Sequence, residues 1–193
     1  MGLDRIALLG TSADPPTRGH QALLEQLIKR YDQVVTWASD NPMKQHGASL
    51  PVRTMLLKAL VEQLNTNNLQ LVQDLSSPFT VITLNRANQR WPKHDLAFVV
   101  GSDLAAQIPS WKEADQWLCR CKIAVAHRQG WPLSETVLAE LSAFGASVDV
   151  LDIDIPASAS SEQRLDPRSE KVPTAVWPLL IKQKLYGLAP NLC

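Results

Sequence analysis

The sequence has 193 residues, and 19 Lys and Arg residues balance 19 Asp and Glu residues, so the formal net charge is zero. This length fits one globular domain covering residues 1–193, and the balanced charge excludes the basic field that would bind nucleic acid. No apolar run reaches the roughly 18 residues needed to span a bilayer, and the N-terminus lacks a signal-peptide core, so we expect a cytoplasmic protein with no membrane partner.

Short apolar runs alternate with helical patterns along the chain, which is typical of a parallel sheet covered by helices on both faces. We expect six strands that are rich in Val, Ile or Leu and buried on both faces. They are predicted at Arg5–Leu9, Gln33–Ala38, Leu69–Val72, Leu96–Gly101, Ile123–Ala126 and Val148–Ile153. The predicted fold class is therefore α/β, with a Rossmann-like open parallel sheet.

Between the strands, apolar residues recur at helical spacing. The first stripe is Leu23, Leu24, Leu27, Ile28 and Tyr31, with Glu25, Lys29 and Arg30 facing outward. The next stripes are Met55, Leu56, Ala59, Leu60 and Leu64, beginning near Pro51; Val81, Ile82, Leu84 and Ala87; and Val137, Leu138 and Leu141. A last helix is predicted to open at Pro173, to contain Val176, Leu179, Leu180 and Leu185, and to bend slightly at Pro178 in its second turn.

Four segments fit neither pattern, and three of them directly follow a predicted strand. They are residues 11–19, 39–50, 102–112 and 156–172. Ligands of an open parallel sheet bind beyond the carboxyl ends of the strands, so we expect these segments to line one crevice.

The cysteines and the isolated histidines carry no metal-binding pattern. Cys119, Cys121 and Cys193 are odd in number and lack the paired spacing of zinc ligands, so we expect reduced thiols. His46, His94 and His127 have no ligand spacing to one another or to acids. We interpret them as surface or ordinary polar residues and expect no metal site made by the protein.

The first predicted strand runs into GTSADPPTRGH, Gly10 to His20, at whose end a helix begins. A glycine at a strand end lets the backbone approach a ligand, and the N–H groups and dipole of a helix N-terminus attract an anion. Gly19 and His20 lie on that first turn, where a histidine can donate a hydrogen bond to a phosphate. Neither a Walker loop nor a dinucleotide fingerprint is present, so another class of phosphate loop is needed. An ordinary strand-to-helix turn is the alternative.

The run Thr17-Arg18-Gly19-His20, after a G-x-S-x-D-P start, resembles the (H/T)xGH superfamily of nucleotidyltransferases. Further segments follow in the order found in bacterial nicotinate mononucleotide adenylyltransferases, which the chain resembles over nearly its whole length. They are NPMK at 41–44, PFTVITL at 78–84, FVVGSDLAAQIPSWKEADQWL at 98–118, SASSEQR at 158–164 and VPTAVWPLLIKQKLYG at 172–187. The resemblance implies the nucleotidyltransferase type of α/β fold and adenylyl transfer from ATP to nicotinate mononucleotide, with Mg²⁺ accompanying the ATP.

The resemblance also implies roles on the ATP side. His20 would bind the α-phosphate region, while Ser160, Ser161 and Arg164 would hold the β- and γ-phosphates. Gly101 would let the backbone pass close to the adenosine. Asp103 would accept from ribose hydroxyls or orient the metal's waters, with a helix N-cap as the alternative. The remaining expected ATP-binding residues are Gly10, Thr11, Ser12, Thr17 and Gly19.

On the acceptor side, Lys44 would pair with the monophosphate, unless it is a solvated surface lysine. Trp111 would stack on the pyridine ring, and Thr80 with adjacent backbone N–H groups would meet the nicotinate carboxylate. Asp14, which also stiffens its loop with two prolines, is expected among the substrate-binding residues. His20, Arg164 and Lys44 are the expected catalytic residues. No enzymatic base is needed, because the acceptor phosphate, with a second pKa near ~6, attacks as the nucleophile.

Three positions depart from the family pattern: Thr17 replaces its usual first histidine, Ala13 its aromatic residue and Ala159 a serine. Thr17 keeps a hydroxyl donor, so activity is expected to remain. The connector from Arg164 to Pro173 is shorter than in relatives, and Lys171 or Arg168 would compensate.

Two other functions stay open. One is a different adenylyl- or cytidylyltransferase of the same superfamily, such as a pantetheine-phosphate adenylyltransferase, against which Trp111 and the C-terminal helix argue. The other is a nucleotide-binding regulator that has lost turnover, against which His20 and Arg164 argue. A monomer and a homo-oligomer fit the apolar pattern equally well.

Overall fold

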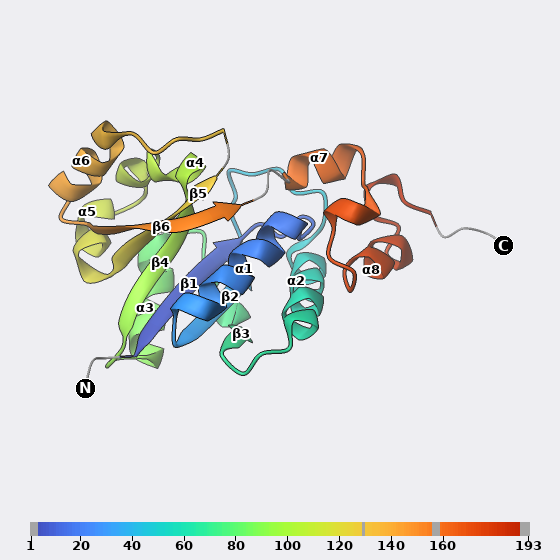
Figure 1. Cartoon of the computed structure of the whole chain (residues 1–193), viewed down its shortest axis with the longest axis horizontal. Coiled ribbons are helices and arrows are strands. Elements are labelled where there is room, and N and C mark those ends of the chain that lie inside the picture. The colour runs from blue at the N-terminus through green and yellow to red at the C-terminus, as the bar shows by residue number, and fades with distance from the viewer. Residues whose placement is uncertain (1–3, 129, 156–158, 190–193) are drawn as a thin grey trace.

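A single parallel sheet forms the centre of the computed structural model, which describes residues 4–128, 130–155 and 159–189 (Figure 1). Its strands are β1 (Arg5–Thr11), β2 (Gln33–Ala38), β3 (Leu69–Leu71), β4 (Asp95–Gly101), β5 (Lys122–Arg128) and β6 (Ser147–Ile155). They pair in the order β3-β2-β1-β4-β5-β6, and every pair is parallel. The order reverses between β1 and β4, which confirms the Rossmann-like sheet. Cys193 and the beginning of the predicted 156–172 loop, with Ser158, lie outside the described residues.

Helices cover both faces of the sheet, as the alternation of elements predicts. The longer ones are α1 (Arg18–Arg30), α2 (Leu50–Leu64), α3 (Thr80–Arg90) and α6 (Glu135–Ala143). The shorter ones are α4 (Ser102–Ala105), α5 (Ala114–Trp117), α7 (Ser160–Leu165) and α8 (Trp177–Lys182). Single 3₁₀ turns are η1 (Gln73–Leu75), η2 (Ile108–Ser110), η3 (Leu118–Arg120), η4 (Ser169–Lys171) and η5 (Leu185–Gly187).

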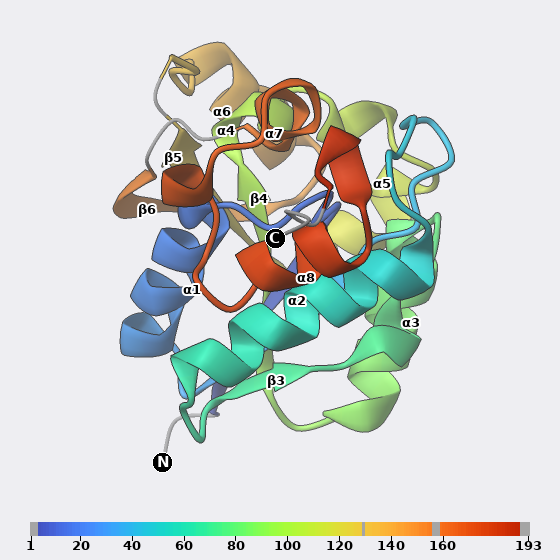
Figure 2. The same cartoon turned by 90° about the vertical axis from the view of Figure 1, so that its right-hand side faces the viewer.

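The alternation of side chains along each strand divides the core into two apolar clusters. On β1, Ala7 and Leu9 pack with α1, α2 and the region of α8, while Ile6 and Leu8 pack with α3, α5 and α6 on the other face. Figure 2 shows α8 lying against α2, so the C-terminal part of the chain extends the first layer. The central strands β1, β4 and β5 are therefore buried on both faces.

The expectation that all six strands are buried on both faces is wrong at the two edges of the sheet. On β6, Leu151 and Ile153 are buried, but Asp149, Asp152 and half of Val150 are exposed. On β3, Gln70 is exposed. An edge strand has a neighbour on one side only, and the helices do not reach over its outer part, so polar residues are tolerated there.

Two helical predictions also need correction. The last helix begins at Trp177 instead of Pro173, so Pro178 lies in its first turn, where a missing N–H costs little. Leu185 belongs to the separate turn η5. In α3, Ile82 is 38% exposed and the buried position next to it is Thr83, whose hydroxyl donates to the Leu75 carbonyl at 3.0 Å.

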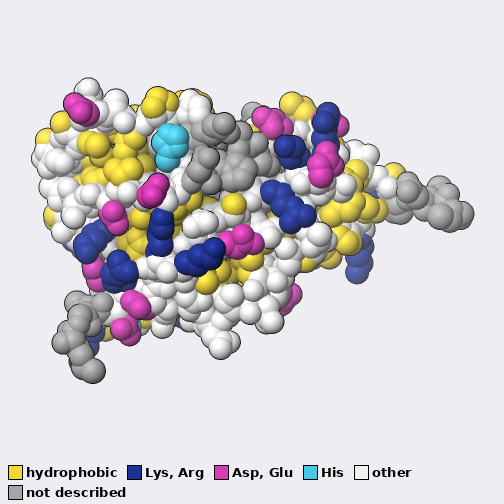
Figure 3. All heavy atoms as spheres, in the orientation of Figure 1, with side chains coloured by type: hydrophobic (Ala, Val, Ile, Leu, Met, Phe, Trp, Pro, Cys, Tyr) yellow, Lys and Arg dark blue, Asp and Glu magenta, His cyan; other side chains and the backbone are white. Residues whose placement is uncertain are grey.

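Charges of both signs are interspersed over the face shown in Figure 3, and no large field of one sign appears there. This distribution matches the balanced composition of the chain. Within the described ranges, none of the helices combines the length and apolarity that crossing a membrane requires.

The two-sided burial of β1 predicts a large stability difference between a central and an edge position. Leu8 is fully buried, so Leu8→Ala should lower the free energy of unfolding by about 2 to 5 kcal/mol. Val150→Ala, at a half-exposed position of β6, should lower it by less than about 1 kcal/mol. Urea unfolding of both variants beside the original protein measures the difference, and equal midpoints would contradict this assignment of the core.

Candidate functional site

The loop after β1 is fixed to the sheet at its first residue. Gly10 lies opposite Trp37 of β2, and a Cβ added at position 10 would be 2.8 Å from two carbons of the indole ring. The Trp37 ring therefore leaves no room for a side chain at position 10. This is a reason for the glycine in addition to the predicted close approach of a ligand. One residue later, the Ser39 N–H donates to the Thr11 carbonyl at 2.7 Å, so the ends of β1 and β2 leave the sheet together.

The carboxylate of Asp14 is fully buried and is surrounded by protein donors. The backbone N–H of Gly47 donates to Oδ2 at 2.7 Å, and that of Ala48 to Oδ1 at 3.1 Å. The Tyr186 hydroxyl donates to Oδ1 at 2.7 Å, and the His46 Nδ1 lies 3.4 Å from Oδ2. The carboxylate thus accepts three hydrogen bonds from the protein, which gives it a structural role, and the predicted contact with substrate stays a prediction. Just before Asp14 in the chain, the peptide N–H of Ala13 donates to Thr11 Oγ1 at 3.3 Å.

A buried arginine also binds the loop after β1, through a main-chain carbonyl. Arg53 of α2 is 1% exposed and donates to the carbonyls of Ser12 at 2.8 Å, Ser39 at 2.8 Å and Ala48 at 3.2 Å. Burial lowers the pKa of its guanidinium, and the nearby Asp14 carboxylate opposes that shift. One planar cation thus ties the end of β1, the end of β2 and the start of α2 into one frame.

Helix α1 begins as the sequence predicts, with Thr17 as its N-cap and Gly19 and His20 in the first turn. The Thr17 N–H donates to His20 Nδ1 at 3.1 Å, and Thr17 Oγ1 lies 2.8 Å from the same nitrogen. A ring nitrogen that accepts an N–H carries no hydrogen, so the neutral ring bears its hydrogen on Nε2. The backbone N–H at position 17 therefore sets the tautomer of His20, and the Thr17 hydroxyl can donate to the same nitrogen.

Helix α7 is attached to the first loop through two of its three predicted phosphate ligands. Ser160 Oγ donates to the Pro15 carbonyl at 2.8 Å, and Arg164 Nη1 donates to the Asp14 carbonyl at 3.1 Å. Arg164 Nη1 also lies 3.7 Å from Asp14 Oδ2, and the arginine side chain is 30% exposed. Ser161 is exposed at the same end of the helix. The structure thus brings residues 160–164 next to the His20 loop, as expected.

The loop that carries Lys44 is open to solvent except where it meets Asp14. Lys44 is exposed, and its N–H donates to the Asn41 carbonyl at 3.1 Å in a local turn. Two residues further on, His46 to Ala48 turn inward to the buried carboxylate. The position fits a lysine that pairs with an incoming phosphate and equally fits the solvated lysine named as its alternative.

Gly101 and Asp103 lie at the end of β4, beside β1 in the sheet. A Cβ at position 101 would overlap Asp103 Oδ1, so the glycine accommodates the aspartate of its own turn. Asp103 is not the N-cap, because that position belongs to Gly101. The ribose or water-orienting role of Asp103 stays a prediction.

Thr80 and Trp111 are brought into one neighbourhood by the residues beside them. Lys112 Nζ lies 4.4 Å from the ring centroid of Phe79, the N-cap of α3, and Thr80 is the first residue of that helix. The Trp111 ring is half-buried and packs edge-on against Phe98, with ring centroids 6.4 Å apart. The Lys112 contact brings the segment that carries Trp111 toward the N-terminus of α3, where backbone N–H groups favour an anion.

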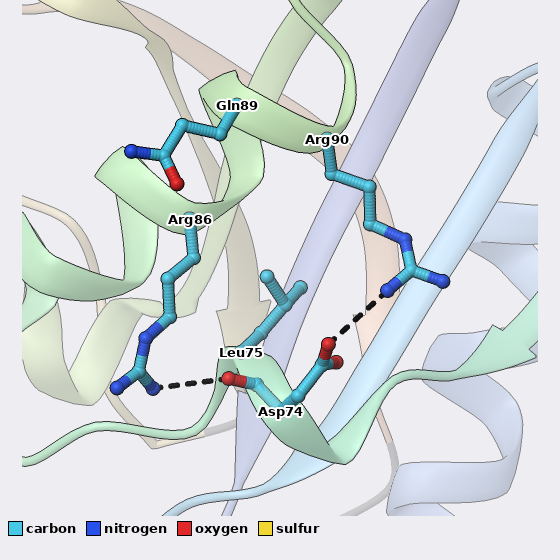
Figure 4. A pocket seen from close by; sticks show the side chains of 5 residues that line it. All are labelled: Asp74, Leu75, Arg86, Gln89 and Arg90. Carbon is cyan, nitrogen blue, oxygen red and sulfur yellow. Dashed lines mark hydrogen bonds and ion pairs between the residues drawn. The ribbon is translucent and has the colours of Figure 1, made fainter.

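A hollow beside α3 contains two arginines that are engaged within the protein. Figure 4 shows its lining residues Asp74, Leu75, Arg86, Gln89 and Arg90. Arg86 Nη1 donates to the Asp74 carbonyl at 3.0 Å and to the Ser76 carbonyl at 2.6 Å. Arg90 Nη1 lies 3.2 Å from Asp74 Oδ2. Both guanidinium groups are thus engaged in fastening η1 to α3.

Sequence reasoning missed three residues of the site: Arg53, His46 and Tyr186. The signal for Arg53 was its spacing, because it shares the buried stripe of α2 with Leu56, Leu57 and Leu60. His46 was interpreted as an ordinary polar residue, yet its Nδ1 faces Asp14 and its Nε2 is buried without a partner. No local pattern pointed to Tyr186, because it lies 172 residues away from its partner. Among the described residues, no group of three His, Cys, Asp or Glu side chains could hold a metal ion.

Comparison with known sequences gives the chain a family context. The profile of the family described as cytidylyltransferase-like matches residues 8–166. A probable nicotinate-nucleotide adenylyltransferase of Synechocystis sp. is 36% identical over 94% of this chain and 98% of its own. A protein of the same name from Chlorobaculum tepidum is 29% identical over 95% of this chain and 99% of its own.

Solved structures share the fold at lower sequence identity. Plasmodium falciparum nicotinic acid mononucleotide adenylyltransferase complexed with NaAD aligns with a TM-score of 0.77 and 19% identity, over 96% of this chain and 98% of that one. The same enzyme complexed with APC aligns with a TM-score of 0.74. At this identity the similarity concerns the arrangement of the sheet and its helices.

The three carbonyls held by Arg53 predict its effect on stability. Arg53→Met should lower the free energy of unfolding by on the order of 3 kcal/mol, because the carbonyls lose their donors in a buried place. Arg53→Lys should recover only part of the loss, since one ammonium cannot reproduce the planar fork. Lys58→Met, on the exposed face of the same helix, is the control and should change stability by less than about 0.5 kcal/mol. Urea midpoints of the three variants test this, and a stable Arg53→Met protein would contradict it.

Proposed function

The chain belongs to the cytidylyltransferase-like family and, within it, to the nicotinate-nucleotide adenylyltransferases; from this premise we propose how its own residues carry out the transfer. The reaction is adenylyl transfer from ATP to nicotinate mononucleotide, which gives nicotinate adenine dinucleotide and pyrophosphate in NAD biosynthesis. The observation that carries the residue assignment is the convergence of three segments on Asp14: the Lys44 loop binds its carboxylate, α7 binds its main-chain carbonyl, and Asp14 itself belongs to the β1 loop.

We propose that the acceptor phosphate is the nucleophile. One of its oxygens forms a bond to the α-phosphorus of ATP, and the bond from that phosphorus to the bridging oxygen breaks, so pyrophosphate leaves with the electron pair. A phosphate that is mostly dianionic at neutral pH needs no base to attack. The task of the protein is then to bring two anions into line and to stabilise the charge that develops on the transferring group.

His20 is the residue that we place at the α-phosphate. Thr17 fixes its Nδ1 as an acceptor, so Nε2–H is the hydrogen-bond donor of the neutral ring. The ring sits in the first turn of a 13-residue helix, where the dipole also favours an anion. Thr11, Ser12 and the backbone around Gly10 and Gly19 complete the proposed ATP contacts on this side, with Gly101 and Asp103 toward the adenosine.

The β- and γ-phosphates are assigned to α7. Arg164 uses one nitrogen on the Asp14 carbonyl, and the remaining donors of its guanidinium suit phosphate oxygens. Ser161 is exposed beside it, whereas the Ser160 hydroxyl is engaged with Pro15, so we expect Ser161 to give the stronger contact. On the acceptor side, Lys44 supplies a positive charge on an open loop.

Mg²⁺ fits this site as a companion of ATP. The candidate residues supply donors and positive charge, with Asp103 as the one carboxylate, so phosphate oxygens and water would be its main ligands. When bound, the ion neutralises charge on the departing pyrophosphate. The cytosol is proposed as the compartment of the enzyme, in keeping with free thiols at Cys119 and Cys121.

The nicotinate ring is assigned to Trp111 and its carboxylate to the N-terminus of α3 with the Thr80 hydroxyl. A carboxylate only accepts hydrogen bonds, and these groups donate them. The Lys112 ammonium beside Phe79 adds a positive charge to the same neighbourhood. An amide NH₂ placed there would face donors and a cation, so the acid is expected to be the preferred acceptor.

The role of His20 is tested by replacement. His20→Ala should lower turnover by roughly 10²-fold or more, because a donor to the reacting phosphate is lost. Gln21→Ala is the control, because the Gln21 side chain hydrogen-bonds to Arg18 and Glu25 of its own helix and is assigned no contact with substrate. Steady-state pyrophosphate release with ATP, Mg²⁺ and nicotinate mononucleotide measures both, and urea unfolding shows whether the variants are folded. Turnover of folded His20→Ala near that of the original protein would refute the assignment.

The choice of acceptor gives a second test. Each unpaired polar group in a closed site costs about 1 to 3 kcal/mol, so kcat/KM should favour the acid mononucleotide over the amide by at least about 10²-fold. Trp111→Ala should raise KM for the acid mononucleotide strongly and for ATP little. Trp131→Ala, which removes a 56% exposed tryptophan, serves as the control and should alter neither constant. Comparable kcat/KM values for acid and amide would leave adenylyl transfer standing and remove this account of specificity.

A further inference from the structure

Tyr186 is held in an unusual backbone conformation at the end of the described chain. It lies in η5 with φ 55° and ψ 36°, and Lys184, two residues earlier, has φ 51°. Non-glycine residues are uncommon in this left-handed region, and they persist where surrounding contacts determine the conformation. Tyr186 also lies beyond residue 166, where the match to the family profile ends.

The contacts that hold Tyr186 are made with the first loop and the Lys44 loop. Its hydroxyl donates to Asp14 Oδ1 at 2.7 Å. Its ring packs so closely on Gly47 that a Cβ there would lie 2.9 Å from Cε1. Burial, together with the hydrogen bond to Asp14, raises the pKa of Tyr186 above its ordinary value, so the hydroxyl keeps its hydrogen and donates.

We propose that Tyr186 is a positioning residue for the acceptor substrate: by donating to Asp14 it holds the carboxylate in the orientation that receives Gly47 and Ala48, and so fixes the loop that carries Lys44. The inference rests on the proposed assignment of that loop to the acceptor phosphate. Tyr186 itself acts through Asp14 and is not assigned a contact with either substrate.

The same contacts explain why the acceptor side should respond more than the ATP side. The carboxylate of Asp14 holds the backbone at 47–48 with bonds of 2.7 and 3.1 Å. Helix α7, by contrast, donates its hydrogen bonds to the main-chain carbonyls of Asp14 and Pro15, which the loss of a tyrosine hydroxyl leaves in place. Its one approach to the carboxylate, Arg164 Nη1 at 3.7 Å from Oδ2, is longer than a hydrogen bond. A carboxylate with one donor fewer turns toward its remaining partners, and the peptide N–H groups that depend on it shift with it.

The chain contains two tyrosines, and the second supplies a matched control. Tyr31 is buried at the C-cap of α1, under the Arg5 guanidinium, just before β2 begins. It therefore lies at the amino end of the strands, away from the proposed site. Tyr31→Phe removes the same hydroxyl as Tyr186→Phe without touching Asp14.

The test compares the two variants in the full-length enzyme with ATP, Mg²⁺ and nicotinate mononucleotide. Tyr186→Phe should raise KM for the mononucleotide roughly 5- to 10-fold, the equivalent of about one hydrogen bond, and change KM for ATP less than about two-fold. Tyr31→Phe should change neither. Amide exchange at Gly47 and Ala48, measured without substrate, should accelerate in Tyr186→Phe while exchange of core amides such as that of Leu8 stays unchanged, whereas a general loss of stability would accelerate both.

The outcomes separate this inference from the function on which it rests. If Lys44→Ala raises KM for the mononucleotide and Tyr186→Phe leaves it within two-fold, the positioning role is overturned and the loop assignment survives. If neither variant raises it, the loop assignment falls as well. Should Tyr186→Phe fail to fold, Gly47→Ala replaces it, because the added methyl would lie 2.9 Å from the tyrosine ring while the hydroxyl stays intact. The methyl would also lie 2.8 Å from Arg164 Cδ, so KM for ATP is measured beside it, and a rise confined to KM for the mononucleotide supports the inference. An unchanged KM for the mononucleotide in that variant would overturn the inference.

Discussion

The buried carboxylate of Asp14 is the interaction on which the site depends. A charge removed from water is tolerated only when donors surround it, and here they come from the Lys44 loop and the C-terminal turn η5. The Arg53 guanidinium donates hydrogen bonds to main-chain carbonyls of the same loops, those of Ser12, Ser39 and Ala48. The loops after β1 and β2 are therefore held by hydrogen bonds to these two buried side chains, and α7 is attached to the first of them through the Pro15 and Asp14 carbonyls.

The sheet and the order of the proposed site segments could be predicted because their signals are local. Central strands such as β4 are continuous apolar runs, and the stripe of α1 repeats at 3.6-residue spacing, so burial on both sides of the sheet determines both patterns. The loop from Gly10 to His20 was predicted for a related reason: its strand and its helix N-terminus are adjacent in sequence, and an anion site needs only that juncture.

The rest could not be predicted because it depends on contacts between distant segments. From the sequence, Asp14 was interpreted as a loop residue that contacts substrate. Its burial depends on contacts with Gly47 and Tyr186, which lie far from it in the sequence. Pro178 was predicted to bend the last helix, because residues 173–176 were assigned to that helix. In the structure the helix begins only at Trp177, so Pro178 lies in its first turn. The exposed side of β6 was missed because apolar and acidic residues alternate on an edge strand, and the sequence does not state which strand lies at the edge.

The hydrogen bond between Tyr186 and Asp14 also has a consequence for the order of assembly. At a synthesis rate of about 5 to 20 residues per second, the tyrosine is made roughly 10 to 30 seconds after the aspartate, which it follows by 172 residues. During that interval β1 and its loop can pair with their neighbours, but the carboxylate stays short of a donor and hydrated. A contact of such long sequence separation has a loop-closure cost that must be met before it can form. The hydrogen bond that orients the Asp14 carboxylate therefore cannot form until a residue made 172 positions later is available.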